Sequence, residues 1–300
     1  MVIGNIKCDG TFLSGEVSYT NDKEVASSIP PHNYIEGVCT ECGNSDPGYA
    51  QLVDGWYEVS NPEQLLYISA LVNSGKFDIK VRLTADIDLS GISYFPPIGK
   101  QYYPQGPTLS FNGVFDGQGH IIYNLKIDKD DPGAETGLFG RIENATVKNL
   151  GIVNATFKNP SALRAGVLGG SSINSNVINC FTTGEINMDD CICSYDSRNG
   201  DGLFGLVFTG SILTNCYTTY GTLGNDYAPD IKFENCYWGE KAIAGVSTGE
   251  LCYKLNGDQN NIVWYQTLVE DTFPILDNTH KQIYVIGNKS NLSKSYNLTK

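Results

Sequence analysis

The chain lacks long apolar runs, an excess of basic residues and the common nucleophile and nucleotide motifs. None of its apolar segments approaches the roughly 20 residues of a membrane-spanning helix, so we expect no transmembrane segment. Aspartate and glutamate number 33 against 20 lysines and arginines, and the net charge of −13 argues against a nucleic-acid partner. No GxSxG, P-loop or dinucleotide-binding pattern occurs, so nothing in the sequence supports those enzyme classes.

The start of the chain also lacks a recognisable leader. Its first residues, MVIGNIKCDG, have neither the basic nor the apolar region of a signal peptide. This indicates either a cytosolic protein or a mature chain whose leader has been removed. Nine cysteines are an odd number, so they cannot all pair within one chain, and cysteine content alone leaves the compartment open.

Glycine and tyrosine are abundant instead, and asparagine recurs in a pattern. Five asparagines, each followed by leucine or cysteine, are separated by 25, 30, 36 and 20 residues: Asn124, Asn149, Asn179, Asn215 and Asn235. Glycine-led phrases that begin at residues 113, 137, 166 and 202 precede the first four of these asparagines by 11 to 13 residues. A nearly fixed inner spacing with a variable outer spacing is typical of stacked repeats that accept insertions at one turn.

Within the repeats, apolar residues alternate with polar ones. In HIIYNLKID, which begins at His120, the residues of one parity are Ile121, Tyr123, Leu125 and Ile127. Period-two patterning predicts short strands with one buried face, and the apolar spacing of helical repeats is missing. The sequence therefore predicts an all-β fold, a right-handed parallel β-helix in which each repeat stacks on the previous one.

Stacking would place the recurring asparagines at one corner of successive repeats. Asparagine tolerates left-handed backbone geometry, and its amide both donates and accepts, so these side chains would form a hydrogen-bonded ladder. The residues that follow would form one interior column: Leu125, Leu150, Cys180, Cys216 and Cys236. We interpret these cysteines as small apolar core residues in preference to metal or redox groups.

Two segments carry the signals of short helices that would close the two ends of the stack. In the first, Asn61 is the expected N-cap, Pro62 the first helical residue and Gln64 the partner in a capping box. In the second, Ser247 is the expected cap and Glu250 closes the box.

These signals divide the chain into three parts. We expect a small Cys/His segment over 1–50, a parallel β-helix with its N-terminal helical cap over 51–246, and a C-terminal cap and tail over 247–300. The last residues, YVIGNKSNLSKSYNLTK, are expected to form a flexible or edge-forming tail.

The repeats also resemble a known family. FNGVFDGQGHIIYNLKI at 111–127, followed by GLFGRIENATVKNLGIVNATF at 137–157, resembles the GLUG-motif repeat proteins of bacterial surfaces. The resemblance extends over roughly 55–285 and implies a β-helix with a scaffolding or adhesive role. The insertion over 187–201 and the irregular glycine phrase over 166–170 depart from the family pattern in the middle repeats.

The strongest candidate for a metal site is at the N-terminus: Cys8, His32, Cys39 and Cys42. Cys39 and Cys42 form a Cys-x-x-Cys pair, and tetrahedral zinc accepts three thiolates and one imidazole. Four protein ligands leave no position for a reacting water, so such a zinc would be structural. The alternative is a loose or disulfide-linked segment, because Cys8 lies far from the other residues.

A second candidate site is the acidic set Asp86, Asp88 and Asp116. Paired carboxylates can act as acid and base in sugar hydrolysis or hold calcium in a lyase. The alternative for these residues is turn chemistry, because aspartate before glycine is most often a turn residue.

A third candidate is a set of aromatic residues beside a proline-rich loop: Tyr94, Phe95, Tyr102 and Tyr103. Aromatic rings bind sugars and partner proteins well. The alternative is that the loop simply packs onto the β-helix.

Two functions of different classes follow. The first is a non-catalytic, adhesin-like module at the cell surface or secreted, monomeric, and bound to a glycan or to a host or microbial surface protein. The second is a polysaccharide-degrading lyase or glycoside hydrolase that uses surface carboxylates. The sequence favours the first, with structural zinc as the single cofactor to be expected.

Overall fold

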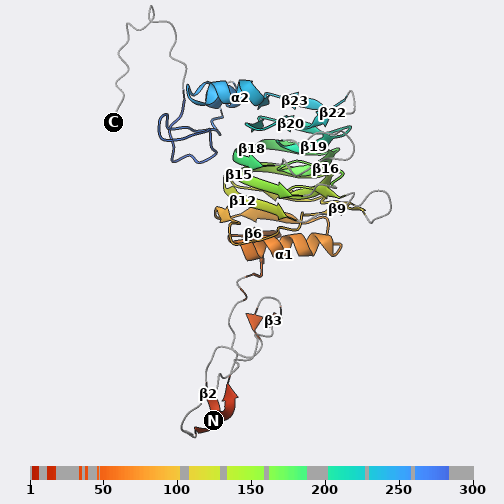
Figure 1. Ribbon diagram of the computed structural model, residues 1–300, viewed down its shortest axis with the longest axis vertical. Coiled ribbons are helices and arrows are strands. Elements are labelled where there is room, and N and C mark those ends of the chain that lie inside the picture. The colour runs from red at the N-terminus through yellow and green to blue at the C-terminus, as the bar shows by residue number, and fades with distance from the viewer. Residues whose placement is uncertain are drawn as a thin grey trace, which may run out of the picture.

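The computed structural model describes residues 2–6, 12–17, 34–35, 38–39, 46, 48–101, 108–128, 134–158, 162–187, 202–226, 230–257 and 261–283. Strands dominate these residues and helices are few, which confirms the prediction of a mostly β chain (Figure 1). Most of the strands belong to three stacks of parallel neighbours. Within the described ranges, no helix is both long enough and apolar enough to cross a bilayer.

The first stack joins strands from the whole length of the repeat region. In order they are β6 (Trp56–Val59), β7 (Lys80–Leu83), β11 (Val114–Asp116), the first part of β15 (Thr146–Lys158), the first part of β18 (Asn176–Asn187), β20 (Ile212–Thr214) and β23 (Lys232–Glu234). Each pairs in parallel with the next, and β5 (Gln51–Val53) ends the stack by pairing antiparallel with β6.

The second stack continues from the first because β15 and β18 bend and run through both. Its members are β8 (Ile87–Asp88), β12 (Ile121–Asp128), the second parts of β15 and β18, β21 (Tyr217–Thr218) and β24 (Tyr237–Trp238), all parallel.

The third stack is a separate four-stranded sheet of β14 (Phe139–Glu143), β17 (Gly169–Ile173), β19 (Phe204–Val207) and β22 (Asn225–Asp226). Two smaller pairs lie beside it, the parallel β13 (Glu135–Thr136) and β16 (Arg164–Ala165), and the antiparallel β9 (Lys100–Gln101) and β10 (Thr108–Leu109). Near the N-terminus, β1 (Val2–Ile6) pairs antiparallel with β2 (Phe12–Val17), and β3 (Tyr34–Ile35) with β4 (Val38–Cys39).

The core lies between the stacks, and residues at the same register share it. Phe115, Val147, Val177 and Leu213 are successive register partners, and all four side chains are fully buried. Each contributes about 1.5–3 kcal/mol of burial free energy. The predicted interior column is confirmed for its later members, because Leu150, Cys180 and Cys216 are fully buried and Cys236 is half-buried.

Four of the predicted asparagines form the expected ladder, at the bend between the first and second stacks. Their φ angles are 52° or 53°, for Asn149, Asn179, Asn215 and Asn235. Nδ2 of each of the last three donates to Oδ1 of the asparagine one repeat earlier, at 2.9, 3.2 and 2.8 Å. At the start of this ladder, Asn149 donates to the Asp116 carboxylate at 3.1 Å.

The prediction that Asn124 belongs to this ladder is wrong. Asn154 is its partner one repeat later and donates to Asn124 Oδ1 at 3.4 Å, while Asn124 donates to Asp88 at 2.7 Å. Leu125 is buried, but in register with Ala155 and outside the predicted column. The repeat that carries Asn149 has a second asparagine corner five residues later, at Asn154, so the apparent step of 25 residues joins one corner to the other.

The glycine phrase at 113 is likewise not equivalent to the later ones. Ile98 forms a parallel bridge with Phe139, so the Ile98-Gly99 phrase is the partner of the GLFG phrase at 137. A Cβ on Gly140 would lie 2.1 Å from the Gly99 carbonyl oxygen, which explains the glycine. Gly169 replaces a phenylalanine of the neighbouring repeats, and a Cβ there would lie 2.8 Å from the Phe204 ring.

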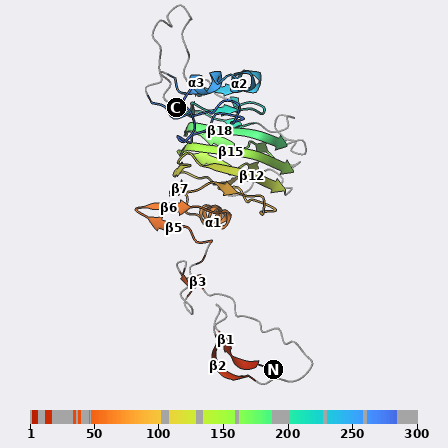
Figure 2. The same ribbon diagram turned by 90° about the vertical axis from the view of Figure 1, so that its left-hand side faces the viewer.

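Helices lie at both ends of the stacks (Figures 1 and 2). Helix α1 (Pro62–Asn73) begins as predicted, since Asn61 accepts from the Gln64 N–H at 2.9 Å. The Gln64 side chain in turn accepts from the Ser60 N–H at 2.8 Å. A cap of this kind stabilises a helix by about 1 kcal/mol.

The predicted cap at Ser247 is wrong. The segment forms two helices, α2 (Gly239–Val246) and α3 (Glu250–Leu255), and Ser247 is the C-cap of α2. Gly249 has φ 75° and reverses the chain immediately before α3. Glu250 pairs with Lys254 one turn later, so its carboxylate supports the helix from within instead of closing a capping box.

The C-terminal segment, residues 261–283, lies against the outer face of the second stack (Figure 1). Its Trp264 is fully buried, with its ring centroid 5.7 Å from Phe181, which stacks on Tyr217 at 5.2 Å. The Tyr217 hydroxyl donates to the Pro274 carbonyl at 2.6 Å. The predicted tail over 284–300 and most of the insertion over 187–201 lie outside the described residues.

Candidate functional site

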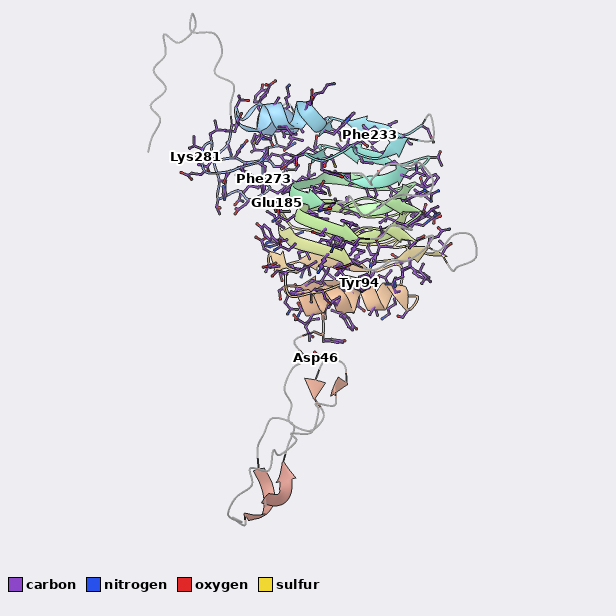
Figure 3. All side chains as sticks on the ribbon, in the orientation of Figure 1. Asp46, Tyr94, Glu185, Phe233, Phe273 and Lys281 are labelled. Atoms are coloured by element: carbon purple, nitrogen blue, oxygen red, sulfur yellow. The ribbon has the colours of Figure 1, made fainter. Side chains whose placement is uncertain are left out.

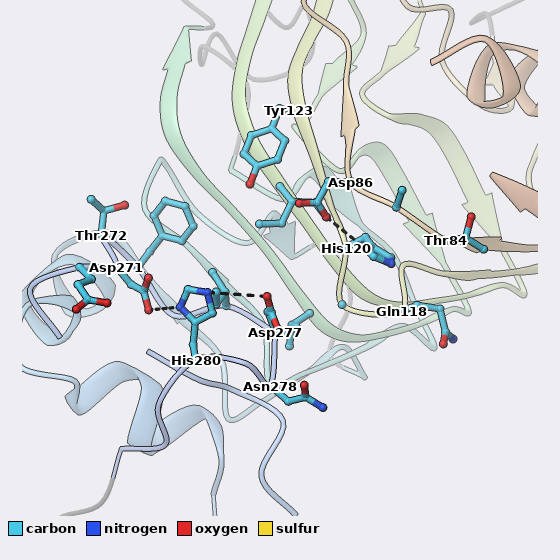
Figure 4. Close-up of a pocket in the computed structure, with 17 residues that line it drawn as sticks. Thr84, Asp86, Gln118, His120, Tyr123, Asp271, Thr272, Asp277, Asn278 and His280 are labelled. Carbon is cyan, nitrogen blue, oxygen red and sulfur yellow. Dashed lines mark hydrogen bonds and ion pairs between the residues drawn. The ribbon is translucent and has the colours of Figure 1, made fainter. Parts of the chain in front are cut away.

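A cavity opens between the C-terminal segment and the turns that lead into β8 and β12 (Figure 4). Its volume is about 780 Å³, and its walls come from residues 84–86, 118–123 and 270–280. Small-molecule sites typically have volumes of roughly 300–1,000 Å³. The polar groups of the lining include Asp86, His120, Asp271, Asp277 and His280.

The wall formed by the repeats is built around Asp86 and His120. Asp86 Oδ1 accepts from the Ile121 N–H at 3.0 Å and lies 3.1 Å from His120 Nδ1 (Figure 4). His120 reaches this position because the preceding residues, Gln118 and Gly119, both have positive φ and form a tight turn. The phrase DGQGH is therefore a turn that directs an imidazole at the carboxylate of the previous repeat.

The opposite wall is built around His280. Its Nδ1 lies 2.7 Å from Asp271 Oδ2, and its Nε2 lies 3.9 Å from Asp277 Oδ2 (Figure 4). The Thr279 N–H donates to Asp277 and holds the pKa of that carboxyl below its usual range, and the nearby His280 and His120 act in the same direction. One imidazole thus contacts two carboxylates on the same wall.

Aromatic side chains complete the cavity. Tyr123 is half-buried, and burial, followed by the negative charge of Asp86, raises its phenol pKa. The Phe273 ring centroid lies 5.9 Å from that of Phe181, so Phe273 anchors its wall to the apolar cluster behind it. The cavity therefore combines rigid apolar surface with carboxylate acceptors and imidazoles, which suits a ligand that carries several hydroxyl groups.

Of the predicted acidic set, Asp86 alone lines this cavity. Asp88 accepts from the Asn124 amide, which is the main reason that its pKa is lowered, and from the Ser90 N–H. Asp116 is buried and accepts from Asn149, with Lys148 Nζ 3.0 Å away. The structure thus places Asp88 and Asp116 at the starts of two asparagine ladders, and neither residue lines the cavity with Asp86.

The aromatic residues predicted to form one ligand site also lie in different surroundings. Phe95 is fully buried and its N–H donates to the Lys126 carbonyl, so this ring is packed in the core and the prediction that it binds a ligand is wrong. Tyr94 is half-buried and packs against the same core. Tyr102 and Tyr103 lie outside the described residues.

The predicted zinc ligands Cys8, His32, Cys39 and Cys42 have no described side chains. Among the residues that are described, no group of three or more His, Cys, Asp or Glu side chains is arranged to hold a metal ion. The free cysteines that are described, Cys180, Cys216, Cys236 and Cys252, are buried or half-buried.

Sequence reasoning missed Asp271, Asp277 and His280. The phrase EDTFPILDNTH contains all three, and its Asp-x-x-His spacing is a visible but weak signal. Nothing in the repeat spacing places this segment beside Asp86 and His120, because the segment lies outside the repeats.

Comparisons with known proteins give limited matches. No family model matches the sequence. Halomucin of Haloquadratum walsbyi is 35% identical over 153 residues, which are 47% of this chain and 2% of that protein. A solved structure described as a proposed immunoglobulin A1 protease of Bacteroides ovatus aligns with a TM-score of 0.44 and 23% identity, over 61% of this chain and 56% of that chain. The chain is thus similar to a very small part of halomucin and to about half of the solved chain.

Proposed function

We propose that this protein is a non-catalytic, adhesin-like module with a right-handed parallel β-helix of the GLUG-repeat kind. In-register parallel pairing between strands 30 and 36 residues apart supports the β-helix, as do the asparagine ladders at two corners. The phrases that resemble GLUG repeats, GLFGRIENATVKNLGIVNATF above all, fall on β14 and β15. A crystal structure of the chain tests the handedness and the closure of each turn.

The proposed ligand is a glycan, and it binds in the cavity between the C-terminal segment and the second stack. One observation carries this proposal: the cavity brings four carboxylates and two imidazoles together beside Tyr123 and Phe273. Carboxylates accept hydrogen bonds from sugar hydroxyls, and aromatic rings pack against the apolar faces of sugar rings. The module would act at the cell surface or after secretion, as a monomer and without a nucleic-acid partner.

The direct test is a glycan and protein array probed with the full chain, followed by titration of each hit. We expect Asp86→Asn and Asp277→Asn to weaken glycan binding by about ten- to a hundredfold, the range for a lost charged hydrogen bond of about 1.5–3 kcal/mol. Asp54→Asn, an exposed residue of the β5–β6 turn, is the matched control. Hits confined to proteins, or affinities unchanged in both variants, would contradict the proposal.

Polysaccharide degradation is the second candidate, and one observation favours it. His280 contacts both Asp271 and Asp277, and paired carboxylates can supply an acid and a base for glycoside cleavage. A panel of polysaccharides assayed for new reducing ends and for unsaturated products tests this activity. Cleavage that disappears in Asp271→Asn would replace the non-catalytic proposal, and a panel without any cleavage would remove the second candidate.

The N-terminal Cys/His segment, residues 1–50, is proposed to hold structural zinc through Cys8, His32, Cys39 and Cys42. The set of three thiols and one imidazole matches the ligands that tetrahedral zinc prefers. Elemental analysis of the purified chain should give one zinc per molecule, and Cys39→Ser should lower that value. An equal zinc content in both proteins would contradict this site.

A further inference from the structure

A second concave site, which we call the groove, crosses the outer face of the second stack. Its volume is about 790 Å³, and its lining comes from 89–92, 124–126, 154–156, 184–187 and 219–220. Those five segments belong to five successive repeats, so the groove crosses the strands instead of following one of them. It begins beside the first cavity, because Tyr123 lines the cavity and the next residue, Asn124, lines the groove.

The polar side chains of the groove are arranged in register from repeat to repeat. Lys126 pairs with Thr156, and Thr156 pairs with Asn187, so these three side chains form one row. Asn124 and Asn154 form a second row and are hydrogen-bonded to each other at 3.4 Å. Neighbouring strands in a sheet are about 4.8 Å apart, which is close to the length of one sugar unit in an extended polysaccharide.

The asparagines retain hydrogen-bonding capacity for a ligand. Asn154 donates to Asn124 and accepts from the Glu185 N–H at 2.8 Å, and Asn124 donates to Asp88. An amide has two N–H groups and two oxygen lone pairs, so each ladder amide still has a second N–H to offer. Both side chains are half-buried at the groove.

A β-bulge interrupts the ladder in the middle of the groove. Between Val153 and Ala155 the register with β18 shifts by one residue, so Gly184 and Glu185 together face Asn154. Gly184 has φ 87°, and a Cβ there would lie 2.3 Å from Asn154 Oδ1. The bulge replaces a third ladder side chain by the backbone N–H of Glu185 and leaves the Glu185 carboxylate exposed at the side of the stacks (Figure 3). Bulges often re-aim a side chain next to a functional site.

The charge of the groove limits what it can bind. Lys126 and Glu185 are its charged residues, of opposite sign, and Lys126 Nζ also lies 3.6 Å from Asp128. The lining itself therefore carries one charge of each sign and is rich in amide and hydroxyl groups. This composition fits a ligand with many hydroxyls and no charge better than an anionic polymer or a basic peptide.

The backbone of the groove argues against a peptide as well. β15, the strand in the middle of the groove, is paired with β12 on one side and with β18 on the other, so it has no free edge there. A bound peptide strand gains its affinity chiefly from such an edge. Contacts in the groove must instead come from side chains, which is how proteins recognise sugars.

We propose that the groove binds a linear, uncharged oligosaccharide laid across successive repeats, with about one sugar unit for each repeat. Asn124, Asn154 and Thr156 would bond its hydroxyls along the centre, and Glu185 would accept from a hydroxyl at the bulge. The site is distinct from the cavity of the proposed function, and each can be tested without the other.

The test is calorimetric titration of the full chain with β-1,4-linked hexasaccharides of glucose, mannose and xylose, and with hexagalacturonate as the charged comparison. We expect at least one neutral hexasaccharide to bind and hexagalacturonate to bind at least tenfold more weakly. Glu185→Ala and Asn187→Ala should each weaken neutral binding about tenfold, and Thr156→Trp should abolish it by filling the groove.

Matched controls lie on the same strands but on the first stack. Asn176→Ala changes an exposed asparagine at the other end of β18, and Thr146→Trp places the same bulk at the start of β15. Both should leave neutral binding unchanged. The inference is overturned if no neutral hexasaccharide binds, if hexagalacturonate binds equally well, or if Thr156→Trp binds like the wild type. Binding that survives Thr156→Trp but is lost in Asp277→Asn would overturn the groove and support the cavity.

Discussion

At the scale of single residues, each ladder asparagine meets two requirements at the same corner. Its backbone has positive φ, which asparagine tolerates better than other non-glycine residues, and its amide links one repeat to the next. The ladders that begin with Asn149 and Asn124 each start at an aspartate, Asp116 and Asp88 respectively, whose carboxylate accepts from the amide of that first asparagine. A carboxylate is suited to that end because it accepts hydrogen bonds and has none to donate.

Substitutions at Asn179 separate these two requirements. We expect Asn179→Ala to lower the free energy of unfolding by about 2–4 kcal/mol. The substitution removes ladder hydrogen bonds, and it places alanine, which tolerates positive φ less well than asparagine does, at that corner. Asn179→Gly removes the same bonds without the backbone strain and should cost about 1 kcal/mol less. Urea unfolding measures both. Asn176→Ala, on the same strand but exposed, is the control, and an equal effect of all three substitutions would contradict the ladder as a source of stability.

Gly151 gives a second prediction at this scale. A Cβ on Gly151 would lie 2.3 Å from the Phe181 ring, which is fixed between Tyr217 and Trp264. Gly151→Ala should therefore destabilise the protein by about 1–3 kcal/mol, as overpacked cores do.

The second substitution Phe181→Leu tests the cause of that loss. It removes the ring that the new methyl group meets, so the double variant should be less destabilised than the sum of the two single ones. Gly91→Ala is the control, since a Cβ there meets nothing within 4 Å. Strict additivity of Gly151→Ala and Phe181→Leu would contradict the proposed clash.

The buried thiols should be unreactive in the native protein. Burial raises the pKa of the Cys216 thiol well above its ordinary value and, with the charge of Asp271, raises that of Cys252 to about 12. Thiolate is the reactive form, so at pH 8 both residues should resist iodoacetamide until urea unfolds the chain. Peptide mass spectrometry resolves them from the other cysteines. Rapid native labelling of Cys216 or Cys252 would contradict their role as core residues.

At the scale of elements, local chemistry was readable from the sequence and long-range placement was not. The cap of α1 involves neighbours within a few residues and is confirmed, and the alternating segment does form the strand β12. The prediction that its residues of one parity share one buried face is wrong, because the positive φ of Asn124 reverses the alternation. Leu125 and Ile127 lie in the main core with Ile122, whereas Ile121 and Tyr123 belong to the cluster beneath the C-terminal segment. The repeat partner of Asn124 was misassigned because two corners carry the same residue type. The position of 261–283 follows no repeat, so neither the cavity nor the burial of Trp264 against Phe181 could be predicted.

The attachment of this C-terminal segment should depend on pH. Asp277 has a lowered pKa because the Thr279 N–H and the two histidines favour its charged form. A group whose pKa is lowered on folding contributes stability above its unfolded pKa, about 3.9 for aspartate, and loses that contribution as the pH falls through its folded pKa. We therefore expect the segment to loosen on acidification below about pH 4.

Trp264 fluorescence reports this change in a protein whose other tryptophans, Trp56 and Trp238, are replaced by phenylalanine. Asp277→Asn should loosen the segment at neutral pH and flatten its acid dependence. Asp54→Asn is the control for the loss of one negative charge, and it should leave the acid transition in place. Identical acid transitions with and without Asp277 would contradict its contribution.

At the scale of the whole molecule, stability comes from contacts between successive repeats and from the segment that spans them. The longer asparagine ladder starts at Asp116 and ends at the Leu255 carbonyl of α3, which accepts from Asn235 at 3.1 Å. Residues 261–283 cross the repeats on the outside, from the Tyr217 ring to the turn at Gly119, where a Cβ would lie 3.1 Å from the Leu276 carbonyl. In a stack of repeats each repeat contacts its immediate neighbours. The asparagine ladder and residues 261–283 connect repeats that are further apart in the stack.

Tyr217→Phe tests this external connection with the loss of a single oxygen atom. The ring would still stack on Phe181, but the Pro274 carbonyl would lose a buried donor, at a cost of about 1–3 kcal/mol. This loss of stability should affect the C-terminal segment first, so amide exchange over 261–283 should accelerate. Glycan binding in the cavity should also weaken, because Asp271, Asp277 and His280 lie on the wall that this segment forms. The groove belongs to the strands themselves, so hexasaccharide binding there should be unchanged. Equal acceleration of amide exchange in β15 and β18 would contradict this prediction. It would mean that residues 261–283 unfold together with the stacks and not before them.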